Sequence, residues 1–309
     1  MRVLVTGGAG FIGSHIAERL LAEGGTVEVL DDLRNGSRAN VPAGAAFVEM
    51  DLRDPALAEV LGRFRPRAIV HCAAQIDVRV SCQDPVRDAE ENILATLRLL
   101  EAGLASGLEH VVFASSGGAI YGEASGPQDE GHPEVPLNPY GCAKLAVDKY
   151  LHAYRHQRGL TSTSLRFSNV YGPRQGARGE AGVVAVFCKR LREGLPPCIN
   201  GDGGQTRDFV YAPDLAEAVS RVLERRAQGV FNLGTGVETS VKDLATSLCA
   251  LAGMDPARVE HAPGVAGEQR RSVLDPAKAR RELGWTPRTD LREGLETTYR
   301  WFADRRGEA

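Results

Sequence analysis

The chain opens with MRVLVTGGAGFIG (residues 1–13), in which a strand-like run leads into regularly spaced glycines. Residues 2–6 are mostly aliphatic and β-branched and predict a buried strand, and residues 14–23 predict a helix. Gly7, Gly10 and Gly13 stand between them. Glycines at this spacing allow a tight turn, the close approach of a phosphate to the backbone, and packing of the helix on the strand. The helix N-terminus adds free N–H groups and a partial positive charge.

The glycine turn alone would also suit an ordinary turn into a helix, so the next strand decides its meaning. Residues 26–30 (TVEVL) predict that strand, which leads into Asp31-Asp32. Asp31 lies 18 residues after Gly13, close to the ~20 residues expected for the acid that binds an adenosine ribose. Turn and carboxylate together predict a dinucleotide site. The carboxylate favours NAD over NADP, although Arg34 could accommodate a 2′-phosphate.

Length and composition indicate an ordinary globular chain with about two domains. It has 309 residues, 43% of them hydrophobic, and a net charge of −3 with both signs spread along the sequence, which argues against a nucleic-acid partner. No apolar run reaches the ~18 residues that span a membrane, and we expect no signal peptide. Six scattered cysteines show no zinc-ligand spacing, so we predict no metal site and a reducing, cytoplasmic location.

Predicted strands and helices alternate through the first half of the chain, which is typical of a parallel sheet covered on both faces. The predicted strands are 2–6, 26–30, 46–49, 68–72, 111–115, 161–167 and 230–233. The predicted helices are 14–23, 55–64, 85–106, 139–157, 183–193, 213–225, 241–251, 276–283 and 291–302. We predict an α/β fold with a Rossmann-type doubly wound parallel sheet and a smaller C-terminal substrate-binding lobe. Residues 1–170 would form the NAD-binding domain, to which 210–236 return; 171–309, mainly 171–209 and 237–309, would form the lobe.

The predicted helix over residues 85–106 carries more apolar residues than one buried face needs. Leu99 lies off the main apolar stripe. Burial on two sides, with a partner subunit as one of the surfaces, predicts a homodimer.

A second chemical signal is Tyr140-Gly-Cys-Ala-Lys144. Residues four apart share one face of a helix, so the phenol and the ammonium would point the same way. A nearby ammonium is expected to lower the pKa of a phenol from ~10 toward neutrality. Such a tyrosine can take a proton from a sugar or alcohol hydroxyl while hydride leaves the same carbon. The pair could also be an ordinary one on an amphipathic helix, but the glycine turn favours the catalytic interpretation.

At this point the chain resembles the extended short-chain dehydrogenase/reductase family, and within it the UDP-glucose (UDP-galactose) 4-epimerases. The matching motifs are TGGAGFIGSH (6–15), LDDLRNG (30–36), HCAAQ (71–75), ASSGGAIYG (114–122), YGCAK (140–144), RFSNVYGPRQ (166–175), TRDFVY (206–211), FNLGTG (231–236) and RRSVLDPAKARRELGW (270–285). They extend over nearly the whole chain. They are highly specific for the extended family and less specific for the sugar.

The resemblance implies NAD as cofactor and a role for each matching residue. The implied cofactor contacts are Gly7, Gly10, Phe11, Ile12 and Gly13 at the pyrophosphate, Asp31, Asp32, Asn35 and Gly36 at the adenosine ribose, Asp51 and Leu52 at the adenine, and Ala73, Ala74, Gln75, Asn92 and Ser115 toward the nicotinamide. Tyr140 is the implied acid/base, and Lys144 binds the nicotinamide ribose. The implied substrate contacts are Asn169, Val183 and Arg207, unless Arg207 forms a structural ion pair with Asp208 or Asp214.

Three positions depart from the pattern that the resemblance implies. Gly117 stands where many such epimerases have a Ser or Thr that bonds the sugar hydroxyl, so Tyr140 contacts the substrate directly, or Ser116 or a water substitutes. Val265 replaces a phosphate-binding Arg, for which Arg270 or Arg271 could compensate unless both are solvated. Ser272 replaces a bulky tyrosine and leaves room for an N-acetyl group.

The resemblance therefore implies an enzyme that inverts C4 of a UDP-hexose through a transient 4-keto sugar, and Ser272 extends the expectation to UDP-N-acetylhexosamines. Other nucleotide-sugar enzymes are the alternatives. Gly117-Gly118 replace the Asp-Glu pair that a dehydratase needs, whereas a decarboxylase or a uronate 4-epimerase stays open because Arg174 could meet a carboxylate. A non-catalytic NAD-sensing protein would not need the Tyr140/Lys144 pair. The sequence leaves uridine and thymidine open as the base.

Overall fold

The computed structural model describes residues 1–123, 125–176, 182–264 and 269–305. Seven parallel strands form its main sheet, in the order β3-β2-β1-β4-β5-β6-β10. The strands are β1 (Arg2–Thr6), β2 (Thr26–Asp31), β3 (Ala46–Glu49), β4 (Ala68–His71), β5 (His110–Ser116), β6 (Thr161–Phe167) and β10 (Gly229–Leu233). The chain runs outward from β1 to β3 and then returns to β4 on the other side of β1. The predicted doubly wound sheet is confirmed, and its switch point lies between β1 and β4.

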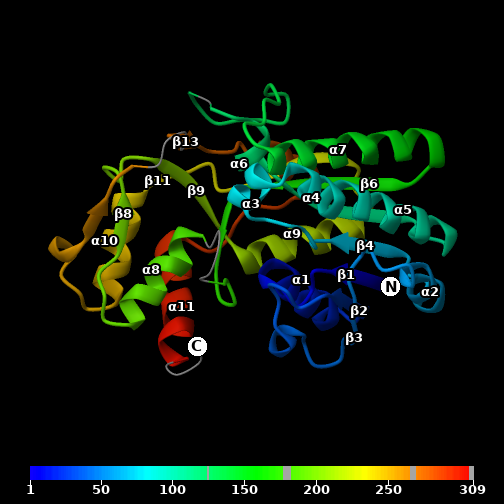
Figure 1. Cartoon of the computed structure of the whole chain (residues 1–309), viewed down its shortest axis with the longest axis horizontal. Helices are drawn as coiled ribbons and strands as arrows, with labels where there is room; N and C mark the ends of the chain where they lie inside the picture. The colour runs from blue at the N-terminus through cyan, green and yellow to red at the C-terminus, as the bar shows by residue number, and fades with distance from the viewer. Residues whose placement is uncertain (124, 177–181, 265–268, 306–309) are drawn as a thin grey trace.

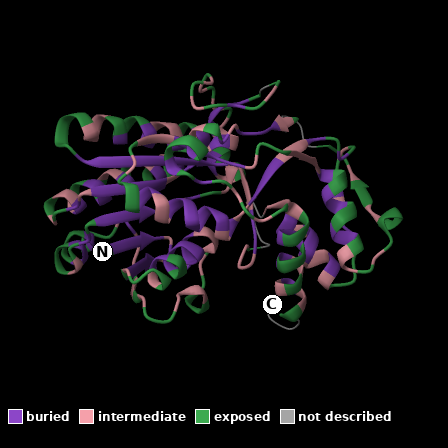
Figure 2. Ribbon diagram, turned by 180° about the vertical axis from the view of Figure 1, so that it is seen from behind, coloured by how far each residue is buried: buried purple, intermediate pink, exposed green. Residues whose placement is uncertain are grey.

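Helices cover both faces of this sheet because its strands alternate their side chains between two cores. Val3 and Val5 pack against α1 (Phe11–Ala22) and α9 (Ala212–Arg225) on one face. Leu4, between them, belongs to the opposite core. That core includes residues of α2 (Leu57–Phe64), α5 (Ala95–Ala105) and α7 (Pro139–Arg158). The strands are buried between the two helical layers, and the exposed residues lie on the outer helix faces (Figure 2).

Three helices gather beyond one end of the main sheet and form a smaller lobe (Figure 1). They are α8 (Val183–Arg192), α10 (Val241–Leu251) and α11 (Leu291–Asp304), which share a hydrophobic core of their own. Two small sheets accompany them: β7 (Asn169–Tyr171), β9 (Thr206–Tyr211), β11 (Glu238–Ser240) and β13 (Arg271–Ser272) in one, and β8 (Cys198–Asn200) with β12 (Glu260–Ala262) in the other. The short helices are η1 (Arg38–Asn40), α3 (Val78–Gln83), α6 (Gly117–Ile120), η3 (Pro256–Arg258) and η4 (Ala279–Leu283).

The predicted helix over residues 85–106 contains a π-helical turn that the sequence pattern did not indicate. It consists of α4 (Pro85–Ala89), the π segment η2 (Glu90–Leu94) and α5. A π turn rotates the residues that follow it. Leu99 is fully buried in the chain's own core, whereas Leu94 is 46% exposed. The side of the helix that carries Leu99 is thus covered by this chain, and a partner subunit on another side stays a prediction.

Within the described residues, no helix is both long and apolar enough to cross a lipid bilayer.

Candidate active site

The turn between β1 and α1 has the close contacts that require glycine. Gly7 has φ +68°, and a Cβ on it would lie 2.6 Å from the backbone nitrogen of Ala73. A Cβ on Gly13 would lie 2.2 Å from the carbonyl oxygen of Gly7. The helix α1, described over its whole length, has no side-chain hydrogen bond at its N-cap Gly10 and no acidic residue in its first turn. Its first N–H groups, beginning at Phe11 and Ile12, are therefore free to bind an anion.

The buried carboxylate at the end of β2 is joined to this turn. One oxygen of Asp31 accepts a hydrogen bond from the Ala9 N–H (3.0 Å) and the other accepts one from the Leu33 N–H (2.9 Å). Burial raises the pKa of Asp31. Gly36 packs against the same group, since a Cβ there would lie 2.8 Å from an Asp31 oxygen. Asp31, Asn35 and Gly36 are thus beside the glycine turn, where the adenosine ribose is expected.

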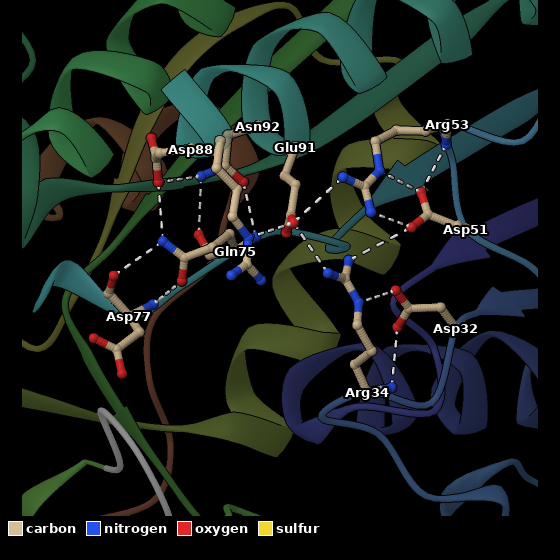
Figure 3. Close-up of polar contacts among 10 residues, drawn as sticks. Asp32, Arg34, Asp51, Arg53, Gln75, Asp77, Asp88, Glu91 and Asn92 are labelled. Atoms are coloured by element: carbon tan, nitrogen blue, oxygen red, sulfur yellow. Dashed lines mark hydrogen bonds and ion pairs between the residues drawn. The ribbon is translucent and has the colours of Figure 1, made fainter. Parts of the chain in front are cut away.

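Arg34 is occupied by carboxylates. Its guanidinium pairs with Asp32 and reaches Glu91 at 3.0 Å (Figure 3). Because these acids already balance its charge, the structure does not support Arg34 as a 2′-phosphate ligand.

The loops after β3 and β4 continue the same edge of the sheet. Arg53 binds Asp51 at 2.6 Å and, through this bond, lowers the pKa of that carboxyl to about 2. Leu52 is buried in the core. After β4, Ala73 and Ala74 lead to Gln75, whose backbone N–H donates to Asn92 Oδ1 at 2.9 Å. Asn92 Nδ2 donates in return to the Gln75 carbonyl, also at 2.9 Å, so η2 fixes this loop (Figure 3).

Tyr140 and Lys144 lie together on the first turns of α7. Asn138 caps this helix by accepting the Gly141 N–H at 2.8 Å, and Pro139 occupies its first turn. Lys144 is buried, its Nζ donates to the Ala114 carbonyl at 2.9 Å, and the same atom lies 5.6 Å from the centre of the Tyr140 ring. The spacing of four residues therefore produces the expected juxtaposition.

The electrostatics of this pair differ from the expectation. Burial raises the pKa of the Tyr140 phenol, and the Asp88 carboxylate adds to the increase. Burial also lowers the pKa of Lys144 to about 8. The expected lowering of the Tyr140 pKa is not found in this structure, because the phenolate loses hydration on burial.

The packing at the end of β5 explains why position 117 is a glycine and not the expected Ser or Thr. Ser115 is buried, and Ser116 caps α6 by accepting the Ala119 N–H at 3.3 Å. A Cβ on Gly117 would lie 2.6 Å from both terminal methyl carbons of Leu274, so Leu274 fills the space that a side chain would need. The next glycine, Gly118, would place its Cβ 3.8 Å from Ser272 Oγ, in ordinary contact.

Three of the expected substrate residues lie in or beside the β7–β9–β13 sheet. Asn169 pairs with Phe209, and Arg207 pairs with Ser272, which is buried. Val183 begins α8. The alternative ion pairs for Arg207 lose support, because both acids are bound elsewhere. The Asp208 oxygens accept from Thr235, Gly236 and Leu274, and those of Asp214 accept from Arg288 and Thr289.

Three other arginines form ion pairs with carboxylates of this chain. Arg270 pairs with Asp202 at 3.0 Å on the surface, and Arg271 pairs with Glu238. Both arginines are therefore paired rather than simply solvated, and their compensation for the phosphate-binding Arg stays a prediction. Val265 itself lies outside the described residues. Arg174 pairs with Glu18, which removes the support for its meeting a substrate carboxylate.

Sequence reasoning missed the charged residues around η2. Glu91 contacts Arg34, Arg53 and Arg87, and Asp88 accepts hydrogen bonds from Gln75 and Asn92 (Figure 3). These contacts join segments that are far apart in the chain. The one available signal was the position of Glu91 immediately before Asn92.

Fold and site together define a class of protein: an α/β enzyme with a dinucleotide-type glycine turn and a Tyr-Lys pair on the first turns of α7. The family model described as "NAD dependent epimerase/dehydratase family" matches residues 3–234. A UDP-glucose 4-epimerase of Mycolicibacterium smegmatis is 43% identical, with 99% of each chain covered.

Two solved structures are similar over nearly the full length. The UDP-glucose 4-epimerase of Thermotoga maritima, solved with UDP-glucose, has a TM-score of 0.95 and 41% identity, covering 98% of this chain and 99% of that one. The UDP-glucose 4-epimerase of Thermus thermophilus, solved with NAD, has a TM-score of 0.93 and 45% identity, with both chains fully covered. The chain belongs to the NAD-dependent epimerase/dehydratase family, as the motifs indicated.

The described residues fit NAD on two observations. The uncapped N-terminus of α1 and the contacts of Gly7 and Gly13 leave a backbone cradle of the kind a pyrophosphate occupies. Asp31, whose carboxylate bonds the Ala9 N–H of that cradle, would be the acceptor for a ribose hydroxyl.

Proposed function

We propose that this chain is an NAD-dependent epimerase that inverts C4 of UDP-glucose and UDP-galactose. The observation that carries the proposal is the position of Tyr140 and Lys144 on α7. Both lie on the first turns of α7, where Lys144 Nζ is 5.6 Å from the centre of the Tyr140 ring and donates to the Ala114 carbonyl of β5. A proton acceptor is needed at this place for oxidation of an alcohol carbon. The relatives named UDP-glucose 4-epimerase support the choice of sugar nucleotide.

In the proposed reaction, Tyr140 acts in its phenolate form: it takes the proton of the C4 hydroxyl and becomes the phenol, while the C4–H bond breaks and a carbonyl forms at C4. NAD, when bound, supplies the nicotinamide ring that accepts this hydride. Lys144, fixed by the Ala114 carbonyl, holds a positive charge near the phenol and toward the cofactor ribose. Ser116 can donate to the sugar oxygen, since its hydroxyl oxygen already accepts the Ala119 N–H. After the 4-keto sugar turns over, hydride returns to the opposite face and Tyr140 returns the proton.

The two parts of the chain would bind different molecules, one the cofactor and the other the substrate. Residues 1–170 and 210–236 would hold NAD, through the glycine turn and the loops after β2, β3 and β4. Residues 171–209 and 237–309 would hold the nucleotide sugar, with Asn169 at the junction and Arg207 at its diphosphate. A guanidinium suits a diphosphate because it offers several N–H donors in one plane.

The sugar pocket would also accept an N-acetyl group. Ser272 is small and buried, and it lies opposite Gly118, which has no side chain. Neither residue would therefore narrow the sugar pocket. We therefore include UDP-N-acetylglucosamine and UDP-N-acetylgalactosamine among the proposed substrates.

We further propose a homodimer that buries the outer face of α4 and α7. This face is hollowed between Ile93, Pro136, Leu137, Cys142 and Ala146. It also exposes Leu94, and Leu137 is 62% exposed. Sedimentation analysis should show a dimer for the wild type and a monomer for Leu94→Glu. A monomeric wild type would contradict the proposed dimer.

We also propose the reducing cytoplasm as the location of the protein. All six cysteines are free thiols, which supports this location.

The proposed activity is tested by incubating the purified protein separately with UDP-glucose, UDP-N-acetylglucosamine, UDP-glucuronate and dTDP-glucose. Proton NMR of the sugar ring distinguishes the C4 epimers. We expect the galacto product from the first two substrates and no decarboxylated or 4,6-dehydrated product. Absence of C4 inversion with UDP-glucose, in protein shown to contain NAD, would refute the proposal. Inversion of UDP-glucose alone would refute only the extension to N-acetyl sugars.

A further inference from the structure

Glu91 is an almost buried carboxylate surrounded by arginines. Its side chain is 5% exposed, and its Oε1 lies 3.0 Å from Arg34 Nη1, 3.0 Å from Arg87 Nε and 3.5 Å from Arg53 Nη1. These arginines come from three segments: the loop after β2, the loop after β3, and α4. Charge-assisted bonds of this kind are the strong ones in proteins.

The loop after β2 is shaped to direct Arg34 toward Glu91. Leu33 adopts φ 59°, a conformation that costs energy in a residue with a branched side chain. The loop is held in this shape by Asp31, which accepts the Leu33 N–H, and by Asp32, which accepts the Arg34 N–H at 3.1 Å and pairs with its guanidinium.

Glu91, the other partner of this ion pair, is also held in place. Glu91 lies in the π turn η2, and its neighbour Asn92 makes two hydrogen bonds with the backbone of Gln75. The same short segment therefore holds the loop after β4 on one side and Arg34 on the other (Figure 3). Insertions of this kind in helices are frequent at functional sites.

From this arrangement we infer that Arg34 and Glu91 form a clasp across the adenosine half of the NAD groove, and that the clasp slows release of the cofactor. The two residues connect the loop that follows Asp31 to the π turn that carries Asn92, two segments at which the resemblance implies cofactor contacts. An enzyme that regenerates its cofactor in each cycle gains from such retention, since loss of the reduced form would strand the keto sugar.

The charges around the clasp also favour NAD over NADP. Arg34, Arg53 and Arg87 are matched by three carboxylates, those of Asp32, Asp51 and Glu91. No arginine of this group is left uncompensated for a 2′-phosphate, and this dianion would be a fourth anionic group, close to Asp31 and Asp32.

The test measures release of cofactor from the holoenzyme. Glu91→Gln keeps the shape of the side chain and removes its charge; Arg34→Gln removes the other partner at a half-exposed site where folding is not at risk. Each protein is loaded with NADH, and the loss of bound NADH fluorescence is followed after mixing with excess NAD. We expect each variant to release NADH about tenfold faster than the wild type. The double variant should be no faster than either single one, because both remove the same contact.

Glu109→Gln is the matched control. Glu109 also bridges two arginines, Arg67 at 2.7 Å and Arg226 at 3.1 Å, but it lies where β5 begins, at the opposite edge of the sheet. The Glu109→Gln variant should release NADH at the wild-type rate. Unchanged release from Glu91→Gln and Arg34→Gln, or independent effects that multiply in the double variant, would overturn the inference. The readout depends on NAD binding and not on which sugar is turned over, so failure of the proposed epimerase activity would be seen separately.

Discussion

Substitution of the adjacent glycines of α6 tests how the site is packed. A serine at position 117 would place its Cβ 2.6 Å from both terminal methyl carbons of Leu274, a fully buried residue. Ordinary contact needs about 3.5–4.0 Å, so Leu274 or the backbone of α6 must move away by about 1 Å. Leu274 is held in place, because its N–H donates to Asp208 at 3.3 Å. Overpacking of this kind costs about 1–3 kcal/mol.

The assay is urea unfolding followed by tryptophan fluorescence, with Gly118→Ser as the matched control. A Cβ at position 118 meets nothing nearer than 3.8 Å, so the control should change stability by less than about 0.5 kcal/mol. Leu274→Ala alone should cost about 2–5 kcal/mol. In the double variant Gly117→Ser/Leu274→Ala the serine occupies part of the vacated space, so the double cost should be about 1–2 kcal/mol less than the sum. Equal effects of the two serine substitutions, or strict additivity with Leu274→Ala, would refute the reasoning.

Three further predictions concern the buried polar groups. Tyr140→Phe should lower the turnover number roughly 100- to 10,000-fold while the protein keeps its NAD, measured by NMR assay and by cofactor extraction; full activity would contradict the assigned role. Arg166→Met should destabilise the chain by about 3–5 kcal/mol in urea unfolding, because it leaves the buried Asp148, now 2.8 Å from the guanidinium, without its partner; a loss under about 1 kcal/mol would be inconsistent with this. Burial lowers the pKa of His110 to about 4. The unfolded state, with a pKa near ~6.5, therefore binds more protons between these pH values, and stability falls on acidification through that window by up to about 1.4 kcal/mol per pH unit. His110→Gln should flatten this part of the profile when urea unfolding is repeated at pH values between 4 and 6.5; an unchanged slope would contradict the assignment.

Local pattern was sufficient to predict the sheet and most helices, because each strand is short, apolar and followed by a turn or helix with its own signals. The ranges 46–49 and 161–167 were predicted as the structure has them. The π turn η2 was not predictable, since its sequence EENIL is as compatible with an α-helix. Leu99 lies in the regular helix α5 after this turn, on the side that is buried together with Leu100 and Gly103.

The site was predictable where it rests on spacing within one element and not where it rests on packing between elements. Tyr140 and Lys144 meet because they are four residues apart on α7. The pKa of Tyr140 depends instead on how deeply the fold buries it, which spacing does not reveal. The arginines around Glu91 converge from three segments, so only the assembled fold brings them together.

The most direct test of the proposed mechanism follows the hydrogen at C4. UDP-glucose carrying deuterium at C4 is incubated in ordinary water with the purified protein, without added cofactor, and the product is examined by NMR and mass spectrometry. Transient oxidation with return of the same hydride predicts UDP-galactose that keeps its deuterium at C4. Inversion with loss of the deuterium to solvent, or no inversion by protein that contains NAD, would contradict the account.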